Sequence, residues 1–94
     1  MIKIIWNDVV IAESPITIII EGVHYFSRHT VRFIYLVPSE TKTTSPWKGD
    51  AHHFHIIAND LLKRDAAWHY PSPYVGAGEL ADRIGFSPEI TFHT

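Results

Sequence analysis

The residue types best suited to metal chemistry are four histidines in the second half of the chain: His52, His53, His55 and His69. His53 and His55 are two residues apart, so on a strand they share one face, as two metal ligands can. His69 can approach from a partner strand, and Asp50 or Asp65 can add a carboxylate. Two histidines without a third fixed ligand are a weak metal signal. We therefore interpret them as half-exposed polar residues on a sheet face, and we expect no metal and no cofactor.

A tryptophan and a lysine lie side by side in the segment Pro46-Trp47-Lys48-Gly49. The flanking proline and glycine constrain the loop and allow a sharp turn. Trp47 offers a flat stacking surface and Lys48 a cationic donor, which together suit a base, a carboxylate or a phosphate. The structural alternative is that Trp47 packs at the edge of the core and Lys48 is solvated.

Trp68 and Tyr70 alternate with His69, so they share one strand face and can form an aromatic wall beside Trp47. The alternative is that both are core residues, because a chain of 94 residues must build its core from large side chains.

A further polar group surrounds a glycine turn and comprises Glu21, His24 and Tyr25, with Arg32 following. These types can do acid–base work or hold an anion, but their spacing matches no catalytic template. The alternative is a set of surface polar residues near a turn.

Several classes of function are disfavoured by composition. The chain has no cysteine, which removes disulfides, thiolate zinc sites and cysteine nucleophiles. The formal net charge of −2 gives no basic footprint, so we expect no nucleic-acid or membrane partner. The sequence contains no phosphate-binding glycine loop, G-x-S-x-G or H-E-x-x-H motif. The start lacks the pattern of a signal peptide and no apolar run is long enough to span a bilayer, so we expect a cytoplasmic protein.

The elements that must position these residues are mostly strands. Residues 2–6 and 9–13 are joined by Asn7-Asp8, and residues 50–58 and 61–70 by Asn59-Asp60; both pairs predict hairpins with type I′ turns. Residues 17–21 predict another strand and Gly22 the next turn. Pro71 and Pro73 end the return strand.

Two segments change period and predict short helices. Ser27 can cap a helix that carries Val31, Ile34 and Tyr35 on one face and stops near Leu36, before Pro38.

The second predicted helix carries Ala77, Leu80, Ala81 and Ile84, with Gly85 just after its end. Residues 39–45 are a loop or an edge strand, and residues 89–92 a last strand. The sum is one mainly β (α+β) domain over residues 1–94.

The order of motifs resembles a small bacterial family, domain of unknown function 427. The matching pieces are Trp6-Asn7, Ile20-Glu21-Gly22 with His24-Tyr25-Phe26, Arg32 with Pro38-Ser39, Thr44 with Pro46-Trp47-Lys48-Gly49, Ala66-Ala67-Trp68-x-Tyr70-Pro71-x-Pro73, and Ile84 to Phe86. The resemblance implies a β-tent of two antiparallel sheets. Relatives of that fold often bind zinc through paired cysteines, which this chain lacks. The family has carried a nucleotidyltransferase-type label, yet no Asp-x-Asp pair is present to hold two metals.

Three functions stay open. The leading hypothesis is a domain that binds a small polar or anionic ligand, with aromatic walls from Trp47, Trp68, Tyr70 and Tyr25. Lys48 and Arg32 would hold the anion, and Glu21 would orient them. The second is a small enzyme of nucleotidyltransferase type acting on nucleotides. The third is an assembly module, such as a homodimer, in which the histidine-rich strand is a sheet edge that pairs with a second copy.

Overall fold

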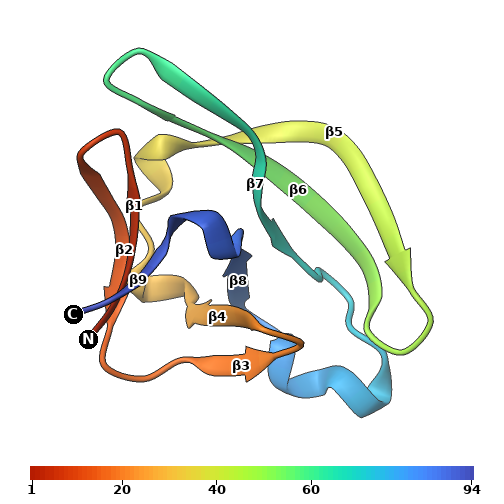
Figure 1. Ribbon diagram of the computed structural model, residues 1–94. Coiled ribbons are helices and arrows are strands. Elements are labelled where there is room, and N and C mark those ends of the chain that lie inside the picture. Colours follow the sequence, from red (N-terminus) through yellow and green to blue (C-terminus); the bar gives the residue numbers. More distant parts are fainter.

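β-Structure dominates the computed structural model, which describes residues 1–94 (Figure 1). The strands are β1 (Ile2–Trp6), β2 (Val9–Ser14), β3 (Ile18–Ile20), β4 (Val23–Ser27), β5 (Leu36–Ser45), β6 (Gly49–Ala58), β7 (Leu61–His69), β8 (Arg83–Phe86) and β9 (Thr91–His93). The helical pieces are 3₁₀ turns: η1 (Arg28–Thr30), η2 (Phe33–Tyr35), η3 (Val75–Leu80) and η4 (Pro88–Ile90).

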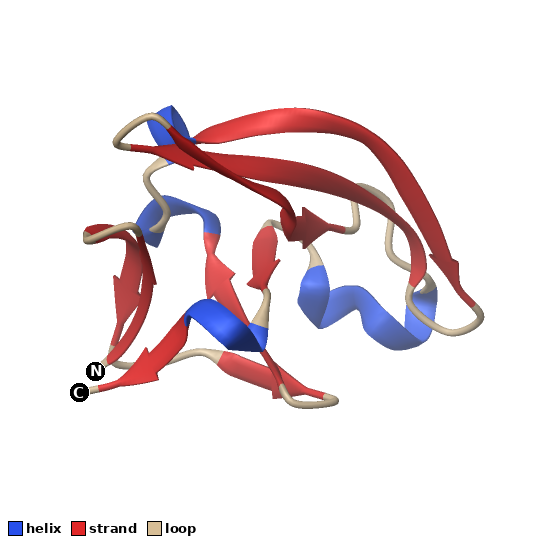
Figure 2. Cartoon of the chain, turned by 45° about the horizontal axis from the view of Figure 1, so that its top comes forward, coloured by secondary structure: helices blue, strands red, loops and turns tan.

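The strands form two antiparallel sheets. The smaller has the order β2-β1-β9 and the larger the order β3-β4-β8-β7-β6-β5. Figure 2 shows the long strands β5, β6 and β7 arching over the shorter elements. The prediction of a mainly β fold with antiparallel sheets is confirmed.

Both predicted Asn-Asp turns are confirmed. Asn7 and Asp8 have φ values of 48° and 67°, and Asn59 and Asp60 have values of 48° and 63°. A type I′ turn needs positive φ at both central residues, which asparagine and aspartate tolerate. A third two-residue turn, Glu21-Gly22, joins β3 to β4 where Gly22 predicted a turn.

The tips of two hairpins bind each other and so tie the two sheets together. Asn7 Nδ2 donates to the Ala58 carbonyl at 3.1 Å, and Asn59 Nδ2 donates to the Asn7 carbonyl at 3.0 Å. Trp6 Nε1 donates to the Leu61 carbonyl at 3.0 Å. In Figure 1 the two tips meet at the upper left.

The predicted helix over residues 27–36 is wrong. Helical turns do occur there, but η1 and η2 are single turns separated by Val31 and Arg32. Val31 forms a bridge with Ala12, and the Arg32 N–H donates to the Ile11 carbonyl at 2.9 Å. Pairing with β2 therefore replaces helical hydrogen bonds at the midpoint of the segment.

Residues 39–45 belong to β5, so the edge-strand alternative is correct. Pro38 fits this strand because an edge strand has one side without ladder partners. The register shifts between Pro38 and Lys42, which marks a bulge.

The second predicted helix is wrong beyond its first turns. Ala77 and Leu80 are buried in η3, but Ile84 and Gly85 lie in β8, between β4 and β7. Gly85 is not a helix terminus. A Cβ atom at Gly85 would lie 2.6 Å from Tyr25 Cε1 and 3.1 Å from Trp68 Nε1. Contact with these aromatic side chains across the sheet explains the glycine.

The large sheet separates two hydrophobic clusters. On one face Phe26 and Phe86 meet edge to face, with ring centroids 5.6 Å apart, within the main core. On the other face Tyr25 and Tyr70 pack with Ala77 and Leu80 in a smaller cluster. The second cluster carries most of the candidate site.

We expect Gly85→Ala to destabilise the protein by about 1–3 kcal/mol, because the added methyl group must displace Tyr25 or Trp68. Urea denaturation measures the effect. Gly78→Ala is the matched control, since a Cβ there meets nothing within 4 Å. Equal stability of the two variants would contradict the crowding at Gly85.

The contact between hairpin tips predicts that Asn7→Gly and Asn59→Gly each lower the free energy of unfolding by about 1 kcal/mol. Glycine keeps the positive φ of the turn and removes only the side-chain hydrogen bonds. The double variant should lose less than the sum of the two, because both asparagines serve one contact. Strict additivity in denaturation experiments would show that the tips act independently.

Candidate functional site

An aromatic row crosses the face of the large sheet opposite the main core. Tyr25 on β4 and Trp68 on β7 both pair with Gly85 on β8, and His53 on β6 pairs with Trp68. The Trp68 indole N–H donates to the Tyr25 hydroxyl at 3.3 Å, and the His53 ring lies 5.8 Å from the Trp68 ring. Gly85 lets the two large rings approach over a strand that adds no side chain of its own.

Tyr70 follows directly after β7 and extends this group. Its ring centroid lies 6.4 Å from that of Tyr25, and only 7% of its surface is exposed. Burial raises the pKa of Tyr70, and neighbouring Tyr25 and Glu21 add to the shift. Tyr70 therefore remains a neutral phenol at any physiological pH.

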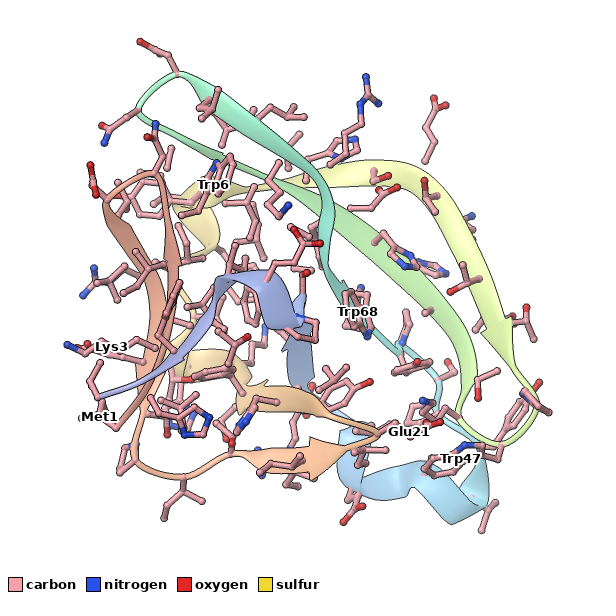
Figure 3. All side chains as sticks on the ribbon, viewed as in Figure 1. Met1, Lys3, Trp6, Glu21, Trp47 and Trp68 are labelled. Atoms are coloured by element: carbon pink, nitrogen blue, oxygen red, sulfur yellow. The ribbon has the colours of Figure 1, made fainter.

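Lys48 brings a positive charge to the margin of the aromatic group. Its Nζ lies 5.2 Å from the centroid of the Trp47 ring and 6.0 Å from that of Tyr70. It also forms an ion pair with Glu21, from the turn between β3 and β4. The Lys48 side chain is only 12% exposed, whereas that of Glu21 is 62% exposed. Figure 3 shows Glu21 and Trp47 at this margin, with Trp68 further inside.

The backbone around Lys48 is held from two sides. Its N–H donates to Ser45 Oγ at 3.2 Å, and its carbonyl accepts from the Tyr74 N–H at 3.1 Å. Gly49 follows with a φ of 109°, and a Cβ there would lie 3.3 Å from the Ser72 carbonyl oxygen. These two hydrogen bonds and the positive φ of Gly49 hold the Lys48 backbone where its side chain lies beside Tyr70.

The structure brings together the predicted residues Trp47, Lys48, Trp68, Tyr70, Tyr25 and Glu21. It does not bring Arg32 to them. The Arg32 guanidinium donates to the Val10 carbonyl at 3.0 Å, in the smaller sheet. The sequence pattern predicts that Arg32 lies on a helix that follows Tyr25, and that helix does not form.

The side chains of this group differ in their exposure to solvent. Tyr25 is 1% exposed and is packed by Ala77 and Leu80, so it serves the core, as does Tyr70. Trp47 is 43% exposed. The accessible features are therefore Trp47, the Lys48–Glu21 pair and part of Trp68. The site is a shallow surface with an aromatic floor.

The alternative of a metal site formed by His53, His55 and His69 does not fit their placement. His69 pairs with His52, on the face opposite to His53. His53 Nδ1 is buried without a hydrogen-bond partner. No group of three histidine, aspartate or glutamate side chains is placed to hold a metal ion.

Asp65 has a structural explanation. Its carboxylate accepts hydrogen bonds from Ser39 Oγ at 2.5 Å and Thr41 Oγ1 at 2.8 Å, and its N–H donates to His55 Nδ1 at 3.0 Å. The hydrogen bond from Ser39 contributes most to lowering the pKa of Asp65. These bonds join the bulge of β5 to β7 across β6.

The histidine-rich strand is not a sheet edge. It forms most of β6, which lies between β5 and β7. The prediction of an edge at this strand is wrong, because β5 and β7 already occupy both of its sides. A homodimer formed in another way stays a prediction.

Lys48 has one carboxylate partner, Glu21. The nearby Asp50 accepts instead from Thr44 Oγ1 at 2.9 Å. The pair of converging carboxylates that two-metal nucleotidyl transfer uses is not formed beside Lys48.

None of the helical pieces is long and apolar enough to cross a membrane.

Comparisons with known proteins agree with the arrangement of motifs. A search of curated proteins finds no match to the chain. A family model described as a domain of unknown function (DUF427), and labelled NTP_transf_9, matches residues 1–93. The chain therefore belongs to the DUF427 family.

Proposed function

We propose that the protein binds a small polar or anionic ligand at the surface formed by Trp47, Lys48 and Glu21. The observation that supports this most directly is the unequal exposure of the ion pair. A lysine side chain that is only 12% exposed meets a glutamate side chain that is 62% exposed and belongs to a two-residue turn. An anionic ligand can take the place of that carboxylate without disturbing the core.

The energetics favour such an exchange. A partly buried ammonium group loses hydration and needs an anion or a hydrogen-bond acceptor. Its pair with an exposed glutamate contributes about 0–1 kcal/mol, so replacing Glu21 costs little. A phosphate or carboxylate can supply the same charge while the rest of the ligand stacks on Trp47.

The buried aromatic side chains support this surface from beneath. Tyr70 stays neutral, so it does not neutralise Lys48. Tyr25 and Trp68 are joined by a hydrogen bond and packed on Gly85, which makes the floor rigid. A rigid floor lowers the entropy lost when a ligand binds.

Substitution of the two charged residues should change affinity in opposite directions. We expect ATP, AMP, citrate or inorganic phosphate to bind the wild-type protein in calorimetry. Lys48→Met should weaken binding at least about tenfold, because the cation is lost. Glu21→Gln should strengthen it by up to about fivefold, because the competing carboxylate is lost.

Lys42→Met is the matched control, since Lys42 is an exposed lysine of β5 that forms no ion pair. The Lys42→Met variant should bind the same compounds with the affinity of the wild type. Absence of binding for all four compounds, or unchanged affinity in Lys48→Met, contradicts the proposal.

A nucleotide-handling enzyme is the second candidate. It is favoured by the contact between Glu21 and Lys48 beside an exposed tryptophan, and by the NTP_transf_9 label of the family. In this hypothesis Glu21 binds a metal–nucleotide complex or accepts a proton.

The enzyme hypothesis predicts pyrophosphate release when the protein is incubated with ATP, Mg²⁺ and candidate hydroxyl acceptors. Glu21→Gln should slow release at least about a hundredfold, while Lys42→Met should have no effect. Unchanged release in Glu21→Gln, or none in the wild type, counts against it.

A further inference from the structure

A second group of aromatic and basic side chains lies on the opposite face of the large sheet. His52 and His69 pair across β6 and β7, with their rings 5.9 Å apart. The Phe54 ring lies 5.2 Å from His69, and the Phe33 ring lies 6.3 Å from Phe54. Neighbouring residues of a strand point to opposite faces, so this row is separate from the one that contains His53.

Arg28 lies at the end of this row. Its guanidinium group lies over the Phe33 ring, 4.6 Å from the centroid. The Arg28 side chain forms no ion pair and no hydrogen bond within the protein. The contact with Phe33 uses the face of the ring, so the five N–H donors of the guanidinium group stay available.

The surroundings of Arg28 form a shallow hollow of about 640 Å³ that is largely open to solvent. The hollow is lined by Arg28, His29, Val31, Phe33 and Asp82. Arg28 and Asp82 are positioned by a backbone hydrogen bond of 2.9 Å from the Arg28 N–H to the Asp82 carbonyl. Nevertheless, their side chains do not form an ion pair. One hollow therefore presents a guanidinium group and a carboxylate that do not satisfy each other.

The positive charge of Arg28 affects the pKa of a histidine in this row. Burial lowers the pKa of His69, and His52 and Arg28 lower it further. His69 is thus favoured in its neutral form, which leaves Arg28 as the permanent cation of this row.

A smaller hollow of about 330 Å³ is lined by Asp50, His52, Pro71, Ser72 and Tyr74. It contains no residue with a permanent positive charge, so it offers an anion no comparable partner. The larger hollow is the better candidate.

We propose that the larger hollow binds a phosphorylated sugar or polyol, with Arg28 and His29 on the phosphate and Asp82 on the hydroxyl groups. The guanidinium fork matches two phosphate oxygens. A carboxylate accepts hydrogen bonds from neutral hydroxyls but repels a second anionic group, so Asp82 selects a ligand with its charge at one end. Val31 and Phe33 supply apolar contact for the carbon skeleton.

Nuclear magnetic resonance titration of the full chain tests this site with ribose 5-phosphate and glucose 6-phosphate. At least one should shift the amide signals of residues 28–33 and 82. Inorganic phosphate should shift those near Arg28 more weakly, and ribose should shift none. No shift with either sugar phosphate overturns the proposal. Equal affinity for inorganic phosphate overturns the choice of ligand class.

Two variants separate the roles of the charges. Arg28→Gln should weaken sugar phosphate binding at least about tenfold, because the charged fork is lost. Asp82→Asn should weaken sugar phosphate binding several-fold and leave the affinity for inorganic phosphate unchanged or higher. Asparagine tolerates the positive φ of 58° at this position, so the turn is kept.

Arg64→Gln is the matched control, because Arg64 is an exposed arginine of β7 without an ion pair. Arg64→Gln should leave the shifts that the sugar phosphate causes at residues 28–33 and 82 unchanged. Loss of binding in Lys48→Met, with none in Arg28→Gln, would falsify this site and assign the binding to the surface at Trp47.

Discussion

Gly85 occupies a place where side chains from two neighbouring strands need the same space. Tyr25 and Trp68 can meet over β8 only because no Cβ atom lies between them. That strand also joins the two halves of the large sheet, β3 and β4 on one side and β5 to β7 on the other. Phe86, the next residue, faces the opposite way into the main core. The contact at Gly85 thus lets the aromatic floor form on one face of β8, while Phe86 anchors the other face in the main core.

The alternation of side chains along β6 and β7 gives this small domain two chemically different faces. One carries Trp68 and leads to Lys48, whose charge is balanced by Glu21. The other carries His69 and leads to Arg28, whose charge has no partner within the protein. The two proposed sites therefore share no residue.

Features set by neighbouring residues can be predicted from the sequence, whereas features set by contacts between distant strands cannot. The turn at Asn7-Asp8 depends on two residues that tolerate positive φ, so it could be predicted locally. The residues around Val31 have the spacing of a helix. Val31 pairs instead with Ala12 of β2, which lies far away in the sequence. Gly85 also fits the pattern of a helix end. The reason for a glycine at this position is the contact with Tyr25 and Trp68, which come from other strands. Periodicity cannot detect either contact.

The same limit separates the predicted site residues from those that were missed. Trp47 and Lys48 are adjacent in sequence, so any fold keeps them close, whereas Arg28 and Asp82 meet only because β4 pairs with β8. A domain of this size must use its large aromatic side chains as core, as Tyr25 shows. Its aromatic residues are therefore poor guides to function on their own. Cations at the margin of that core are better guides, because their charge must be balanced by a mobile side chain, by water or by a ligand.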